Sequence, residues 1–166
     1  MNAKNLILSF LVIATALLAC RSDDEGLQKI DQILQLYVRN TSGQDLLNPK
    51  ISGSYQSLTL TDIGGLYDQS SISGYALKKD ADTVTYLEYK AGATRYLLDS
   101  TNPDYKRYRS DMQANYITSS NDTIQDTISV VYEWTPQVFQ IQSVLYNKAT
   151  VFTKTEGASN IVKIVK

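Results

Sequence analysis

Thr123-Ile-Gln-Asp-Thr-Ile-Ser-Val-Val-Tyr-Glu-Trp134 is the stretch that decides the fold of this chain. Its apolar side chains fall on one side of an extended strand, with Asp126 as the only polar residue among them: Ile124, Ile128, Val130, Tyr132 and Trp134. Successive side chains of a β-strand point to opposite faces, so this spacing predicts a strand that is buried on one face only.

Similar alternation marks further strands, expected at 33–39, 57–61, 74–79, 83–90, 94–98, 105–117 with a break inside it, 138–146, 150–155 and 161–165. Residues typical of turns separate most of them, at 63–65, 99–104, 118–122, 135–136 and 147–148. Turn signals mostly about ten to fifteen residues apart favour an all-β chain folded as a single antiparallel β-sandwich over residues 32–166. Residues 40–57 lack alternation and are expected to form a loop at one edge.

The N-terminal residues follow a different pattern. One positive charge at Lys4 is followed by a mostly apolar run from Leu6 to Ala19, and then by Cys20, the only cysteine. A positive charge, a short apolar core and small residues before the cleavage site are the parts of a removable secretory signal, which here comprises residues 1–19. Leu17-Leu-Ala-Cys20 resembles the bacterial lipobox. That resemblance implies a diacylglyceryl group on the Cys20 thiol and a fatty acyl chain such as palmitate on the new amine.

Residues 20–31 are expected to be a flexible acidic tether behind the lipidated cysteine. The run Arg21-Ser-Asp-Asp-Glu-Gly26 is polar and has no apolar side chain to bury. Acidic residues at this position resemble the export signal of Bacteroidota lipoproteins. The resemblance implies an outer-membrane protein exposed at the cell surface, with retention on the periplasmic side as the alternative.

Composition narrows the possible functions. Signal removal leaves fifteen basic and seventeen acidic side chains scattered along the chain, and the run Lys106-Arg-Tyr-Arg109 is flanked by acids. Nucleic-acid binding normally needs a continuous basic surface, so we expect no nucleic-acid partner. The length left after processing suits one domain that folds without disulfides.

The absence of histidine and of a second cysteine argues against most catalytic and metal sites. It excludes the usual zinc sites and the serine and cysteine triads, so we expect no enzyme activity, metal or cofactor. A hydrolase that relies on two carboxylates stays open as the less favoured alternative. The loop aspartates Asp80, Asp82, Asp122 and Asp126 are interpreted as turn formers rather than calcium ligands.

Tyrosine is over-used, with twelve residues, and two interpretations compete. Most of the rings are expected to pack inside the sheets, because tyrosine favours strands. Exposed rings could instead contact sugars or proteins, and the loop-flanking Tyr67, Tyr105 and Tyr108 are the candidates for this role. Trp134, at the end of its strand, is expected to close the core.

Leu36-Tyr-Val-Arg-Asn-Thr-Ser-Gly-Gln-Asp-Leu-Leu-Asn-Pro49 and the C-terminal segment 139–166 resemble a family of small surface lipoproteins of Bacteroidota. The resemblance implies an immunoglobulin-like sandwich and surface anchoring, and supplies no catalytic residues. Within the first segment we expect a structural corner. Gly43 would take a positive φ, Asp45 would bind backbone amides, and Leu46 and Leu47 would pack under the sandwich edge.

These features together predict a non-catalytic binding or accessory module held at the membrane by its lipid. Its partner would be a glycan, a peptide or another outer-membrane protein. The leading alternative is a structural subunit that assembles by pairing an edge strand with a neighbour.

Overall fold

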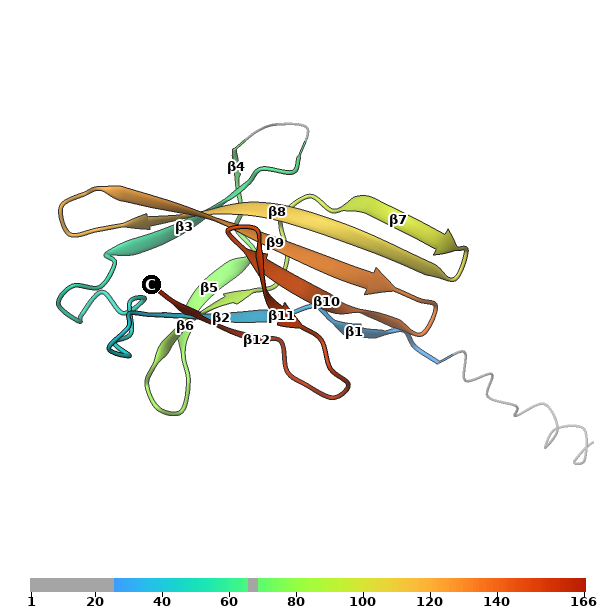
Figure 1. Ribbon diagram of the computed structural model, residues 1–166, viewed down its shortest axis with the longest axis horizontal. Coiled ribbons are helices and arrows are strands. Elements are labelled where there is room, and N and C mark those ends of the chain that lie inside the picture. Colours follow the sequence, from blue (N-terminus) through green and yellow to red (C-terminus); the bar gives the residue numbers. More distant parts are fainter. Residues whose placement is uncertain (1–25, 66–68) are drawn as a thin grey trace, which may run out of the picture.

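The computed structural model describes residues 26–65 and 69–166, which form two β-sheets without any helix (Figure 1). The all-β prediction is therefore confirmed, and the arrangement is sandwich-like. In these two ranges there is accordingly no apolar helix that could cross a membrane.

The larger sheet has the strand order β1-β10-β9-β8-β3-β4, with β11 also paired to β10 and β7 to β8. Its strands are β1 (Lys29–Asp31), β3 (Ser57–Asp62), β4 (Ser70–Ser71), β7 (Tyr96–Asn102), β8 (Tyr105–Ile117), β9 (Thr123–Trp134), β10 (Val138–Tyr146) and β11 (Ala149–Thr153). The smaller sheet has the order β12-β2-β6-β5, formed by β2 (Leu34–Arg39), β5 (Tyr75–Lys79), β6 (Thr85–Tyr89) and β12 (Ile161–Val165).

Both sheets contribute to one hydrophobic core. Ile128, Val130 and Tyr132 of β9 are buried in it together with Leu34 and Leu36 of β2. The alternating apolar residues of β9 therefore form the face of the strand that points into the core. Removal of this apolar surface from water is the main force that holds the two sheets together.

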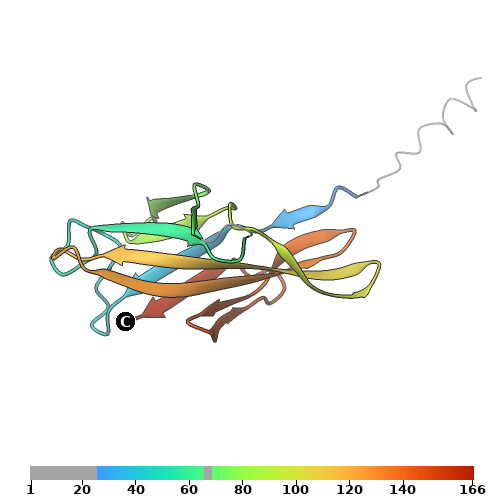
Figure 2. The ribbon, with the colours of Figure 1, turned by 90° about the horizontal axis from the view of Figure 1, so that it is seen from above.

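The larger sheet extends beyond the smaller one at the end that carries β7 (Figures 1 and 2). Trp134 lies at this end of β9 and is only half-buried, with the ammonium group of Lys106 5.0 Å from the centre of its ring. The expectation that Trp134 closes the core is therefore wrong, because the smaller sheet does not reach far enough to cover it.

Two strand pairs are parallel, so the sheets are not wholly antiparallel as expected. β1 pairs with β10 and β12 pairs with β2, in both cases in parallel. A short turn can only join antiparallel neighbours, whereas these partners lie more than a hundred residues apart in the chain. Turn signals in the sequence therefore carry no information about their direction.

The strand boundaries differ from the expected ones in two places. β8 runs through all 13 residues of 105–117 without the expected break, because buried Ser110 and Met112 alternate regularly with half-buried Asp111 and Gln113. β1 lies inside the segment 20–31 that the sequence assigns to the tether. Its backbone is held in place by pairing with β10.

The corner predicted around Gly43 is confirmed. Gly43 has a φ of 84°, and the carboxylate of Asp45 accepts hydrogen bonds from the amides of Leu47 (2.9 Å) and Thr85 (2.8 Å). Leu46 and Leu47 are buried. Asp45 thus fastens the loop 40–57 to the start of β6, at the edge of the smaller sheet.

Replacing Gly43 by valine should lower the melting temperature by several degrees, measured by circular dichroism. A Cβ atom at this position meets no neighbour within 4 Å, so the cost comes from the left-handed backbone, which a β-branched residue rarely adopts. Gly26→Val is the matched control, because Gly26 is also unobstructed and is not held at a positive φ. Equal melting temperatures for the two variants would refute the role of Gly43.

Candidate functional site

A cleft opens at the edge of β10, where β1 and β11 both pair with this strand and leave a gap between them. β1 pairs with residues 138–140 and β11 with residues 143–146, and the register of β10 against β9 shifts by a bulge between Ile141 and Ser143. The cleft has a volume of about 550 Å³ and polar walls, lined by Lys29, Asp31, Glu133, Val138, Gln140, Gln142, Thr153, Lys154, Glu156, Gly157 and Ala158.

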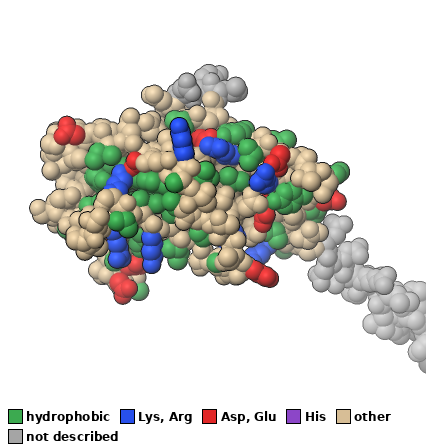
Figure 3. Space-filling view, in the orientation of Figure 1, with side chains coloured by type: hydrophobic (Ala, Val, Ile, Leu, Met, Phe, Trp, Pro, Cys, Tyr) green, Lys and Arg blue, Asp and Glu red, His purple; other side chains and the backbone are tan. Residues whose placement is uncertain are grey.

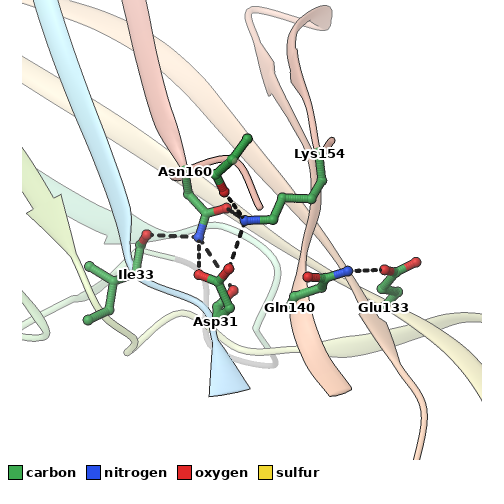
Figure 4. Close-up of polar contacts among 7 residues, drawn as sticks. Asp31, Ile33, Glu133, Gln140, Lys154 and Asn160 are labelled. Carbon is green, nitrogen blue, oxygen red and sulfur yellow. Dashed lines mark hydrogen bonds and ion pairs between the residues drawn. The ribbon is translucent and has the colours of Figure 1, made fainter. Parts of the chain in front are cut away.

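Lys154 forms the base of one wall (Figure 4). Its ammonium group donates to Asp31 Oδ2 at 2.7 Å, to Asn160 Oδ1 at 2.9 Å and to the carbonyl of Ala158. An ammonium group has three protons, so these three acceptors satisfy it fully, and its side chain is only 8% exposed. Asn160 completes the cluster by donating to Asp31 Oδ1 (2.7 Å) and to the carbonyl of Ile33 (3.1 Å).

Asp31 is held in its ionised form. Partial burial alone would raise the pKa of Asp31, but the hydrogen bonds from Lys154 and Asn160, with the positive charge of Lys154, lower it below the usual value. The carboxylate is therefore a permanent acceptor at neutral pH and a poor proton donor.

The opposite wall is a group of amides around Glu133. Gln140 donates from Nε2 to Glu133 Oε1, while Gln142 Nε2 donates to the hydroxyl oxygen of Tyr105 at 3.1 Å (Figure 4 shows Gln140 and Glu133). The Tyr105 hydroxyl lies 3.5 Å from Glu133 Oε2. The cleft therefore presents carboxylate, amide and ammonium groups together, and the Tyr105 phenol contacts Gln142 in its wall.

The structure separates the tyrosines that the sequence selected. Tyr105 reaches the wall of the cleft, whereas Tyr108 lies three residues further along β8, faces the other side of the sheet and packs against the core. Tyr67 and Cys20 lie outside the described residues. Most other tyrosines are structural, as expected, and Tyr89, Tyr116 and Tyr132 are fully buried.

The cleft residues themselves were not found from the sequence. Asp31 and Lys154 are 123 positions apart, and neither belongs to a motif. The one available signal was the pair Gln140 and Gln142, two amides close together within an otherwise apolar strand.

A second polar cluster lies at the far end of β9 and corrects the interpretation of Asp126. This residue is buried rather than a turn former, and its carboxylate accepts from the hydroxyl of Tyr146 and from Asn147 Nδ2 (2.7 Å). Lys166 pairs with the same carboxylate and lies 4.2 Å from the ring centre of Tyr116. Burial raises the pKa of Tyr116 and Tyr146, so neither phenol is prepared to act as a base.

Asp80, by contrast, is a turn former as expected. Its Oδ1 atom accepts from the amides of Asp82 (3.0 Å) and Val84 (2.9 Å). Within the ranges 26–65 and 69–166, three or more metal-ligating side chains do not come together.

Comparison with protein-family models, with curated proteins and with solved structures gave no match. The cleft is therefore interpreted from its own chemistry.

Lys154→Met should lower the free energy of unfolding at pH 7 by roughly 2 to 3 kcal/mol, less than the about 3 to 5 kcal/mol typical of a fully buried pair, since Asp31 is partly exposed. Asp31 has a lowered pKa when folded, so its stabilising effect is complete above its unfolded pKa of about 4 and is lost as the pH falls through the folded value. The difference between wild type and variant should shrink below about pH 4.

Urea denaturation at pH 7 and pH 3 would measure this difference. Lys163→Met, at an exposed position of β12, is the control and should stay close to wild type at both pH values. A Lys154 variant as stable as the control at pH 7 would contradict the importance of the cluster.

Proposed function

We propose that this chain is a surface lipoprotein of the bacterial outer membrane, anchored through lipid on Cys20, with a single immunoglobulin-like sandwich that serves as a non-catalytic binding module. Its favoured ligand is a glycan, bound in the cleft at the edge of β10. The proposal includes the signal at residues 1–19 and the relationship to small Bacteroidota lipoproteins, both of which rest on the sequence.

The composition of the cleft is the observation that carries the proposal. Sugar hydroxyl groups both donate and accept hydrogen bonds, and the walls offer carboxylates, amides and the ammonium group of Lys29 side by side. The Gln142 amide and the Tyr105 hydroxyl are already oriented by Glu133 and by each other. Such preorganisation reduces the entropy lost when a ligand binds.

The same contacts argue against a hydrolase. A glycosidase needs one carboxylic acid whose pKa is raised so that it can donate a proton. Asp31 has a lowered pKa because of Lys154 and Asn160, and Glu133 accepts hydrogen bonds from Gln140 and Gln142. Asp31 is thus suited to accept hydrogen bonds rather than to donate a proton.

Assembly through an edge strand is also less favoured. β5 is an edge strand of the smaller sheet, and its residues from Ala76 to Lys79 are exposed. It ends in Lys78 and Lys79, and lysine on an edge strand is a common means of preventing pairing with another chain.

Changing Cys20 to serine should release the protein from washed membranes and abolish incorporation of labelled palmitate during growth. One acyl chain binds a protein to a bilayer only marginally, whereas two or more acyl chains bind it stably. Loss of all acyl chains therefore removes the anchor. Ser22→Ala, two residues further on, is the control and should leave both readouts unchanged. Wild-type distribution of the Cys20→Ser protein would refute the lipid anchor.

Glycan-array binding by a protein that begins at residue 21 tests the ligand. We expect a defined set of glycans to bind, and Glu133→Gln combined with Gln142→Ala to weaken binding at least about tenfold, because two hydrogen-bonding groups are changed. Gln113→Ala changes an amide of β8 that does not line the cleft and should bind normally. A blank array together with self-association would instead support assembly through an edge strand.

A further inference from the structure

We propose that the overhanging end of the larger sheet contacts the lipid surface directly through apolar side chains. This inference rests on the proposed lipid anchor at Cys20. It adds an orientation to the anchored protein and assigns a partner, the lipid bilayer, to a surface that the core leaves uncovered.

The N-terminal segment leaves the domain at this end. Gln28 donates from its side chain to the carbonyl of Thr135 (2.6 Å), and the amide of Lys29 donates to the carbonyl of Gln137 (2.8 Å). Both acceptors lie in or next to the turn between β9 and β10. Seven residues lie between Cys20 and Gln28, and the eight residue steps that join them span at most about 29 Å when fully extended. The lipid therefore keeps this end of the domain close to the bilayer.

Apolar side chains are exposed at the same end. The exposed fractions are 97% for Leu27, 64% for Ile30 and 55% for Leu97. Ile30 is paired with Phe139 and Leu97 with Tyr108, and residues directly opposite in neighbouring strands share a face. Ile30 and Leu97 therefore lie on the inner face of the larger sheet, where the smaller sheet is missing (Figure 2).

Trp134 lies in the middle of this surface. It is paired with Phe139 on one side and with Lys106 on the other, and the Lys106 ammonium lies over its ring. Tryptophan and lysine both suit the boundary between lipid tails and water, because each joins an apolar body to a polar end.

The charges here do not form a basic patch. The cations on this face are Lys106 and Arg95, whose guanidinium lies over the ring of Phe139. Asp104 lies in the adjacent turn, and Figure 3 shows acidic and basic side chains interspersed over one face of the molecule. Attraction to anionic headgroups is therefore small, and apolar contact supplies the affinity. We thus expect contact with neutral, zwitterionic lipid as well.

Lipid contact leaves the cleft open. Glu133 and Trp134 are consecutive residues of β9, so their side chains point to opposite faces of the sheet. The lipid surface and the polar cleft are then separate, and a ligand can bind while the overhanging end touches the membrane.

The fluorescence of Trp134, the only tryptophan in the chain, tests the inference. The processed lipoprotein is reconstituted into phosphatidylcholine vesicles, with or without a nitroxide quencher on the acyl chains near the headgroup. We expect quenching by the labelled lipid. We also expect the emission maximum to lie at shorter wavelength than that of the soluble domain, which lacks the lipid and is measured in buffer without detergent. Anchored protein whose emission is neither quenched nor shifted would overturn the inference.

Two variants make the test specific. Ile30→Ser combined with Leu97→Ser should reduce the quenching, whereas Leu77→Ser, on the edge strand β5 of the other sheet, should not. All three positions are at least 41% exposed, so the folds should be preserved. Flotation of the vesicles separates the two proposals: floating protein without quenching refutes only the lipid contact, while protein that does not float refutes the anchor and the lipid contact with it.

Discussion

The buried ammonium group of Lys154 holds together two of the five places where the chain passes from one sheet to the other. The first passage lies between β1 and β2 and contains Gln32, and the second, residues 154–160, joins β11 to β12. Asp31, the last residue of β1, and Asn160, the last residue of the second passage, meet on Lys154. A charge removed from water is stable only when its hydrogen bonds are satisfied, so the position of each passage depends on the other.

Local patterns in the sequence were sufficient for the parts of the fold that are local in the chain. The neighbouring strands β8, β9 and β10 form a meander, and its turns and the alternation of β9 and β10 could be predicted directly. The corner at Gly43 and Asp45 likewise involves residues close in sequence. The pairing of Thr85 with Asp45 already lies beyond such patterns, since 40 positions separate them.

The cleft could not be predicted for the same physical reason. Its walls come from β1, β9, β10 and the segment after β11, and no periodic pattern records which distant strands become neighbours. The sequence selected Tyr105 as a candidate because it stands beside a turn, and its role as a contact residue stays a prediction. It could not indicate that Tyr108 faces the opposite side, since the expected break in the strand hid the continuous alternation of β8. The overhang of the larger sheet could not be predicted for a similar reason. It exists because β8 has 13 residues whereas β2 has 6, and this difference matters only once the two sheets are packed together.

The distant pairing of β1 has a consequence for how the protein reaches its folded state. Its partner β10 begins at Val138, so a chain that is made or transported from its N-terminus leaves β1 without a neighbour until nearly all of it has emerged. Closing a loop of this size costs entropy before any strand contact compensates for it, which makes folding slow. Strand β1 is therefore among the last parts of the larger sheet to find its partner.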